Sequence, residues 1–159
     1  MPAKKSRANA DAPITRARLI ELLNEDLARE YQAIIAYVVY SQMIKGAAFM
    51  TIARELETHA KQELDHALVI AKQIDYLGGT PVVTPKAVKL AEKAETLIRF
   101  DLQNETETIR EYRDRVRQCE ALGEFAMAEH IREILRVEQE HQIDLATALG
   151  EDPPDMTEE

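Results

Sequence analysis

Apolar residues recur at helical spacing in four long segments of the chain. Within each segment they are separated by three, four or seven positions or by sums of these, a period that places them on one face of an α-helix. In chain order the four stripes consist of Leu19, Leu23, Leu27, Ile34, Tyr37 and Ile44; Phe49, Ile52, Leu56, Ile70 and Leu77; Ile98, Leu102, Ile109, Tyr112, Val116 and Cys119; and Met127, Ile131, Ile134, Leu145 and Leu149. Four amphipathic helices of this kind predict an all-α bundle around a shared core.

Glycine and proline mark the ends of these helices. Proline is absent from residues 14–80 and 86–152, and Gly46 and Gly123 divide each of these two blocks once. The predicted helices are residues 16–45, residues 47–77, a third helix that begins between residues 86 and 91 and ends at 122, and residues 124–149. The glycines and prolines of segment 78–85 predict the connection between the second and third helices.

A polar residue interrupts each apolar stripe near its middle. The interruptions are Glu30 in the first helix, Glu63 and His66 in the second, Glu105 in the third, and Glu138 and His141 in the fourth. A glutamate and a histidine three positions apart lie on the same face of a helix. Because these residues stand within the apolar stripes, their side chains are expected to point into the bundle.

The interruptions repeat between the two halves of the chain. Both halves read Asp-Leu-x-x-Glu-x6-Tyr, and both carry Glu-x-x-His 33 residues after the first glutamate. The second copy begins 75 residues after the first, so Glu30 corresponds to Glu105 and Tyr37 to Tyr112. An isolated Glu-x-x-His is common in a glutamate-rich chain, whereas a shared offset of the whole set is not. The chain therefore predicts a duplicated helical hairpin.

Four buried glutamates need compensating charge. Burying an ionised carboxylate costs several kcal/mol, and four of them rival the ~5–15 kcal/mol total stability of a domain. The central turns of the stripes are expected to hold no lysine or arginine that offsets these charges. Two divalent cations would offset them, and carboxylate-rich sites with one imidazole per metal suit iron or manganese better than zinc. The alternative is a metal-free bundle whose glutamates are protonated or reach solvent.

Composition narrows the class of protein further. The 159 residues suit one domain, and with five glycines and six prolines the chain has too few turn residues for a β-sandwich or barrel. The single cysteine, Cys119, excludes an internal disulfide and any multi-cysteine metal site. No apolar run is long enough for a membrane span, and the N-terminus lacks the apolar region of a secretory signal. We therefore expect a cytoplasmic protein that does not contact membranes.

The net charge of −9 has local sources. Residues 1–15 are expected to form a basic, flexible arm, residues 16–150 the helical bundle, and residues 151–159 an acidic, flexible tail. The tail carries −5, and the four glutamates of the stripes carry −4. The acid excess disfavours a general nucleic-acid-binding surface, and a disordered N-terminal arm is favoured over an arm that contacts DNA.

These residues and their spacing resemble the ferritin-like superfamily, most closely bacterioferritin and its Dps-like relatives. The resemblance covers about residues 16–149 and includes all the interrupting residues at the family's spacing. It implies a four-helix bundle in which a long crossover joins the second and third helices along the length of the bundle. Residues 78–90 are long enough for this, since an extended segment of that length reaches about 43 Å.

The resemblance also implies a role for each residue of the site. Glu63 and Glu138 would bridge two metal ions, Glu30 and Glu105 would be terminal ligands, and His66 and His141 would each bind one metal ion. Tyr37 would be a hydrogen-bond partner or an electron donor in catalysis, and its repeat mate Tyr112 is the weaker candidate. The implied cofactor is two iron ions per subunit, with manganese or zinc as substitutes.

The implied activity is ferroxidation. Fe²⁺ would be oxidised by O₂ or H₂O₂ at the paired site, and the ferric product would be stored inside a homo-oligomeric shell, which serves iron homeostasis and protection against oxidative stress. The main alternative is a di-metal oxidase, peroxidase or manganese catalase on the same bundle, without iron mineralisation. A non-catalytic helical interaction module is a further alternative.

The sequence departs from bacterioferritin in three places. Leu64 stands where bacterioferritin has the methionine that binds haem, so haem bound in that way is not expected. Thr58, His59 and Gln62 occupy the turn of the family's inner-surface iron site, and His59 is favoured as a supporting or surface residue over a transfer ligand. The chain ends 18 residues after His141, without the fifth short helix of 24-subunit shells, which favours a Dps-like shell of 12 subunits.

Overall fold

The computed structural model of the protein describes residues 13–157, and all regular structure in that range is helical. The elements are α1 (Arg16–Met43), the 3₁₀ helix η1 (Ala47–Phe49), α2 (Met50–Tyr76), α3 (Ala94–Ala121) and α4 (Phe125–Ala148). The prediction of an all-α four-helix bundle is confirmed, and the part of the chain that the structure describes has no helix after α4. None of its helices is long and apolar enough to cross a membrane.

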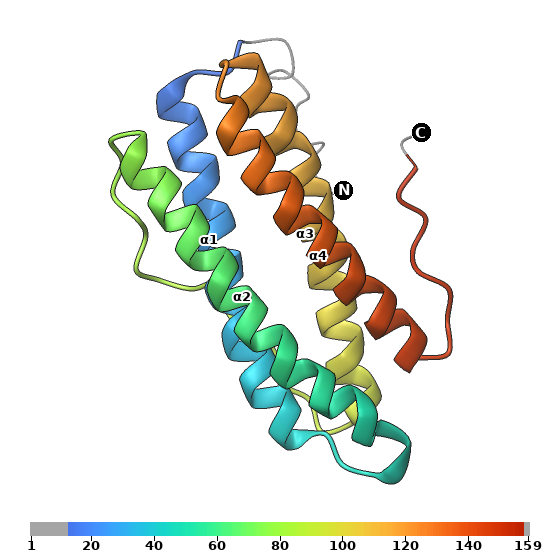
Figure 1. Ribbon diagram of the computed structural model, residues 1–159. Helices are drawn as coiled ribbons and strands as arrows, with labels where there is room; N and C mark the ends of the chain where they lie inside the picture. The colour runs from blue at the N-terminus through green and yellow to red at the C-terminus, as the bar shows by residue number, and fades with distance from the viewer. Residues whose placement is uncertain (1–12, 158–159) are drawn as a thin grey trace, which may run out of the picture.

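The helices form two antiparallel hairpins that pack side by side (Figure 1). α1 packs along α2, and α3 packs along α4, while α1 also contacts α3 and α2 contacts α4. α2 and α3 run in the same direction, so the chain between them returns along the length of the bundle, as Figure 1 shows. This arrangement brings the middles of all four helices to the same level.

The crossover between α2 and α3 lies along α1. Residues 77–93 have no regular secondary structure, and the amide of Lys86 donates a hydrogen bond to the carbonyl of Ala28 on α1 at 3.1 Å. The third helix begins at Ala94, later than the start between residues 86 and 91 that the sequence predicted. The predicted start was wrong because the residues before Ala94 are needed to span the bundle.

Glycines end two of the helices at the positions that the sequence indicated. Gly78 follows α2 with φ of 89° and Gly123 follows α3 with φ of 77°, a left-handed conformation that favours glycine. After Gly123 the amide of Glu124 donates to the carbonyl of Cys119 at 2.8 Å, which closes a tight turn between α3 and α4. Apart from the start of α3, the helix ends lie within three residues of their predicted positions.

Two apolar clusters fill the bundle, one toward each end. Leu23 and Ile131 belong to the first cluster, and Leu56 and Leu145 to the second. All four side chains are fully buried and belong to the predicted stripes. The stretch between the two clusters, near the middle of each helix, is where the polar interruptions occur.

The chain after α4 contacts α3. The guanidinium of Arg99 lies 2.6 Å from the carboxylate of Glu151, and Arg113 donates a hydrogen bond to the carbonyl of Met156. Two residues of the tail, Glu151 and Met156, therefore contact α3, and the flexibility of the tail stays a prediction. The basic arm predicted for residues 1–15 lies almost wholly outside the described residues.

Candidate metal centre

The polar interruptions of all four helices meet in the middle of the bundle. They form a group that we call the buried cluster: Glu30 on α1, Glu63 and His66 on α2, Glu105 on α3, and Glu138 and His141 on α4. Each of these residues is at most 6% exposed. The structure thus brings together every residue that the sequence proposed as a metal ligand, because each stands near the middle of its helix on the face that packs into the core.

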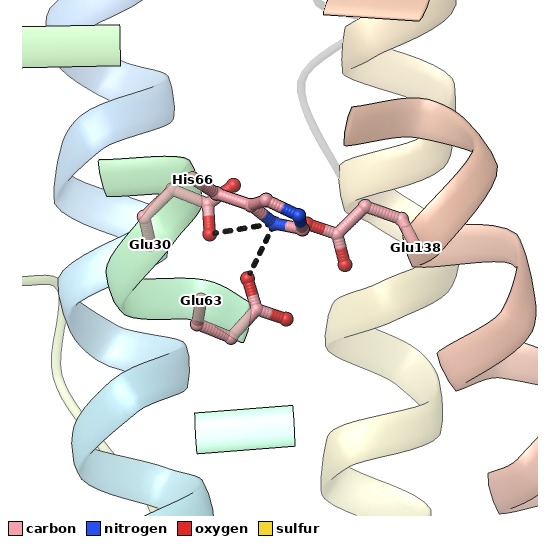
Figure 2. Close-up of side chains that lie close together, drawn as sticks. All are labelled: Glu30, Glu63, His66 and Glu138. Atoms are coloured by element: carbon pink, nitrogen blue, oxygen red, sulfur yellow. Dashed lines mark hydrogen bonds and ion pairs between the residues drawn. The ribbon is translucent and has the colours of Figure 1, made fainter. Parts of the chain in front are cut away.

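Three carboxylates surround the imidazole of His66, as Figure 2 shows. Its Nδ1 atom lies 3.0 Å from Oε1 of Glu138 and 3.1 Å from Oε2 of Glu63. Oε2 of Glu30 lies further away, at 3.8 Å. One ligand atom from each of the four residues lies within 4.8 Å of the others, a spacing that one metal ion can span.

The imidazole of His141 has equivalent surroundings. Its Nδ1 atom lies 2.9 Å from Oε1 of Glu63, 3.3 Å from Oε2 of Glu138 and 3.7 Å from Oε1 of Glu105. Its Nε2 atom lies 2.7 Å from Oε1 of Gln62, an amide oxygen that only accepts hydrogen bonds. The Nε2 proton of His141 is therefore donated to Gln62, which orients the ring and leaves Nδ1 to face the carboxylates.

Glu63 and Glu138 belong to both halves of the buried cluster. Glu63 directs Oε2 toward His66 and Oε1 toward His141, while Glu138 directs Oε1 toward His66 and Oε2 toward His141. A carboxylate with one oxygen in each of two neighbouring sites has the geometry of a bridging ligand. Glu30 and Glu105 each face only one histidine, as terminal ligands would.

A tyrosine holds each of these two outlying glutamates. The hydroxyl of Tyr37 on α1 donates to Oε1 of Glu105 at 2.5 Å, and the hydroxyl of Tyr112 on α3 donates to Oε1 of Glu30. The two bonds cross between α1 and α3 in opposite directions, as the internal repeat requires. Burial raises the pKa of both phenols well above the usual range. The hydrogen bonds give no reason to rank Tyr37 above Tyr112, as the sequence had done.

The metal-free cluster distributes its protons unevenly. Burial, then repulsion by Glu63 and Glu138, raises the pKa of Glu30, and burial with the same two neighbours raises that of Glu105. Burial alone would raise the pKa of Glu138, but hydrogen bonds with Glu105 and both histidines hold it well below its usual range. Burial likewise opposes the charged form of His66, yet hydrogen bonds to Glu138 and Glu63 raise its pKa to about 9. Protons thus supply the positive charge that the four carboxylates need.

Hydrogen bonds within the buried cluster leave some of its atoms without a partner. Among the described residues, Oε2 of Glu30 and Oε2 of Glu105 have no hydrogen-bond partner, and the single Nδ1 atom of His141 lies between Oε1 of Glu63 and Oε2 of Glu138. A buried polar atom left without a partner costs about 1–3 kcal/mol. Metal coordination uses these same carboxylate oxygens and imidazole nitrogens, so the residues fit two divalent cations, each with three carboxylates and one imidazole.

Two buried arginines lie close to this region but pair elsewhere. Arg115 is 1% exposed, and its Nε atom lies 2.6 Å from Oδ2 of Asp26, which also pairs with Arg29. Both arginines compensate Asp26 and not the buried cluster, so among the described residues no arginine offsets the four glutamates. One repeat away, Tyr40 stands in place of an arginine, and the buried Asp101 has an Oδ2 atom without a partner. The sequence offered a signal for these two buried aspartates, because Asp26 and Asp101 are the first residues of the two Asp-Leu-x-x-Glu copies.

His59 and Leu64, two positions on α2 where the sequence departs from bacterioferritin, differ in their exposure to solvent. Leu64 is exposed, whereas His59 is buried and not a surface residue. The His59 ring stacks on that of His141 with centroids 3.9 Å apart, and its Nε2 atom lies 3.1 Å from Oδ2 of Asp144. Burial and the neighbouring His141 lower the pKa of His59 to about 4, so this imidazole is neutral at neutral pH. His59 therefore supports a residue of the buried cluster directly.

Comparisons with known proteins agree with this geometry. Residues 20–153 match the family described as the ferritin-like domain. The chain is 22% identical over 142 residues to a bacterioferritin of Brucella melitensis, an alignment that covers 85% of this chain and 88% of the relative. It is 28% identical over 127 residues to a bacterioferritin of Desulfovibrio desulfuricans, with 79% of this chain and 71% of the relative covered.

Two solved structures resemble the whole bundle. A protein from Bacillus anthracis, described as ferritin-like and diiron-carboxylate, superposes with a TM-score of 0.81 at 34% identity, over 84% of this chain and 96% of the other. A bacterioferritin-related protein from Bacteroides fragilis, described as a dodecameric thioferritin, superposes with a TM-score of 0.80 at 27% identity, over 87% of this chain and 88% of the other. The family match spans most of the chain, and the two relatives compared above are named bacterioferritins. The chain therefore belongs to the ferritin-like family, of the bacterioferritin type.

Proposed function

We propose that this protein is a ferroxidase that oxidises Fe²⁺ at the buried cluster and stores the ferric product within a homo-oligomeric shell. The observation that carries the proposal is the sharing of Glu63 and Glu138 between two sets of three carboxylates and one imidazole. Oxygen-rich sets with a single imidazole suit iron, and a small ligand number per ion leaves room for an oxidant. Relatives that are named bacterioferritins support the same assignment.

The proposed reaction is balanced with Fe²⁺ as the electron donor. Two Fe²⁺ give one electron each, and these two electrons with two protons reduce O₂ to H₂O₂, or H₂O₂ to two molecules of water. The chain holds both substrate ions together, so that the oxidant receives its two electrons at one place. The four carboxylates balance the charge of two Fe²⁺, while Gln62, Tyr37 and Tyr112 keep the ligands oriented through the hydrogen bonds described above.

The proposed shell is made of twelve copies. Residues 151–157 lie outside any helix and contact α3, so this part of the chain forms no fifth helix after α4. The similar Bacteroides fragilis protein is described as dodecameric, which supports the same size here. The cytoplasmic location inferred from the sequence stays a prediction.

The test begins with anaerobic titration of the metal-free protein with Fe²⁺, followed by addition of O₂ or H₂O₂. Ferric absorbance should appear after the oxidant, and iron should remain with a particle of about twelve chains on size-exclusion chromatography. Glu63→Ala should lose this oxidation, because Glu63 serves both halves of the buried cluster, whereas Glu133→Gln on the exposed face of α4 should retain it.

Two results would contradict the proposal. Normal iron oxidation by Glu63→Ala would mean that the buried cluster is not the site of Fe²⁺ oxidation. Oxidation of Fe²⁺ by the wild type without any iron retained in the particle would instead favour a di-metal oxidase or peroxidase on the same bundle.

A further inference from the structure

A second group of metal-ligating side chains lies outside the buried cluster. Glu55 and His59 are one helical turn apart on α2, and Asp144 faces them from α4. One carboxylate oxygen of each acid and one ring nitrogen of His59 lie within 4.8 Å of one another. We call these three residues the outer cluster.

The outer cluster borders a cavity between the start of α2 and the end of α4. This cavity has a volume of about 260 Å³, and both Glu55 and Asp144 line it, together with Thr51 and Thr147. Glu55 is exposed and the side chain of Asp144 is 43% exposed, so a hydrated cation can reach both carboxylates from solvent. His59 lies behind them and is buried.

The protein itself does not satisfy the groups of the outer cluster. Nε2 of His59 forms a hydrogen bond with Asp144, but the buried Nδ1 atom of His59 has no hydrogen-bond partner among the described residues. Between residues 13 and 157, no lysine or arginine forms an ion pair with Glu55 or Asp144. Two neighbouring carboxylates without a cation repel each other, and one divalent cation would offset both charges.

His59 joins the outer cluster to the buried cluster. Its ring stacks on His141 with the planes at 25°, and the edge of Tyr37 lies beside it with ring centroids 5.1 Å apart. A cation held by the outer cluster is therefore one imidazole away from a residue of the buried cluster. Thr58 and Gln62, which stand in the turn of the inner-surface iron site in bacterioferritin, are not part of this group, and Gln62 is already bonded to His141.

We propose that Glu55, His59 and Asp144 bind one divalent cation at the solvent-facing end of the route by which Fe²⁺ reaches the buried cluster. Two carboxylates and one imidazole are a suitable donor set for Fe²⁺, Mn²⁺, Co²⁺ or Zn²⁺, and the cavity leaves space for water as the remaining ligands. Cation binding at this site does not depend on the proposed ferroxidase function, whereas its role as an entrance rests on that function.

Co²⁺ binding to the metal-free, full-length protein tests the site. By equilibrium dialysis, the double variant Glu55→Gln/Asp144→Asn should bind one Co²⁺ fewer per chain than the wild type. Loss of two direct ligands should weaken this site by more than the about 10–100-fold that loss of an outer-shell partner costs. The double variant Glu57→Gln/Glu133→Gln removes two exposed carboxylates from the same two helices, and it should bind as many Co²⁺ as the wild type.

Glu63→Ala separates this proposal from the proposed function. This variant should lose Co²⁺ from the buried cluster and keep the outer ion, visible in crystals as anomalous scattering beside His59. The outer site would be overturned if the wild type and Glu55→Gln/Asp144→Asn bound the same number of Co²⁺ ions with the same affinity, whatever the iron chemistry. If Glu55→Gln/Asp144→Asn lost the outer ion but oxidised limiting Fe²⁺ at the rate of the wild type, the entrance role would be refuted. Full Co²⁺ binding at both clusters with no Fe²⁺ oxidation would contradict the proposed ferroxidase alone.

Discussion

Two glutamates of the buried cluster should respond very differently to the same substitution in the metal-free protein. Glu138 lies 3.0 Å from Nδ1 of His66 and 3.3 Å from Nδ1 of His141, and its hydrogen bonds hold its pKa well below the usual range despite burial. Burial and repulsion by Glu63 and Glu138 instead raise the pKa of Glu30. At neutral pH we therefore expect Glu138 to carry a charge and Glu30 to carry a proton.

Glutamine has nearly the shape of a protonated glutamate. Glu30→Gln keeps an Oε1 atom that accepts the hydrogen bond from Tyr112, so its effect on the free energy of unfolding should stay below about 1 kcal/mol. Burial opposes the charged form of His141 as well, but hydrogen bonds with Glu105, Glu138 and Glu63 raise its pKa, so Glu138→Gln removes a charge that faces two protonated imidazoles in the core. Breaking a buried ion pair by removing one partner costs about 3–5 kcal/mol, and we expect a loss of this size.

Urea unfolding of chelator-treated protein at pH 7 measures both effects. All variants are compared at one protein concentration, because the subunits associate in the proposed shell. Glu133→Gln, an exposed carboxylate on α4, is the matched control and should unfold like the wild type. If Glu30→Gln and Glu138→Gln lowered the free energy of unfolding equally, the assigned difference in protonation would be wrong.

Further predictions concern Tyr37 and Tyr112, Arg115, and Cys119. Tyr37→Phe and Tyr112→Phe should each weaken anaerobic Fe²⁺ binding by about tenfold, since outer-shell partners orient ligands, and an effect of Tyr37→Phe alone would contradict the equivalence of the two tyrosines. Arg115→Met should cost about 1.5–3 kcal/mol in urea unfolding, because Asp26 loses its charged hydrogen bonds from α3 and keeps only Arg29 as a partner, and unchanged stability would refute this. Burial raises the pKa of the Cys119 thiol from 9.0 to about 11, so a thiol reagent should label it at pH 8 only after unfolding. Because the folded pKa is the higher one, this thiol should lower stability progressively from pH 9 to about pH 11, as unfolding titrations across that range would detect.

The sequence alone predicted the number of helices, most of their ends and the residues of the buried cluster. Apolar periodicity identifies the face of each helix that enters the core, and a glutamate within that face must lie inside the bundle wherever the partners sit. The repeat then placed Glu30 and Glu105, like the two Glu-x-x-His pairs, at the same level in both hairpins. The start of α3 could not be predicted in this way, because the length of the crossover depends on the distance that it spans.

Only the tertiary structure decided which atoms meet across helices. The bonds from Tyr112 to Glu30 and from Arg115 to Asp26 join residues more than 80 positions apart, and the outer cluster joins α2 to an aspartate of α4. Periodicity gives the face on which a side chain stands, but not the rotation and offset of the neighbouring helix that select its partner. Those quantities arise from the packing of all four helices together, and they determine how the carboxylates of Glu63 and Glu138 are shared between two histidines.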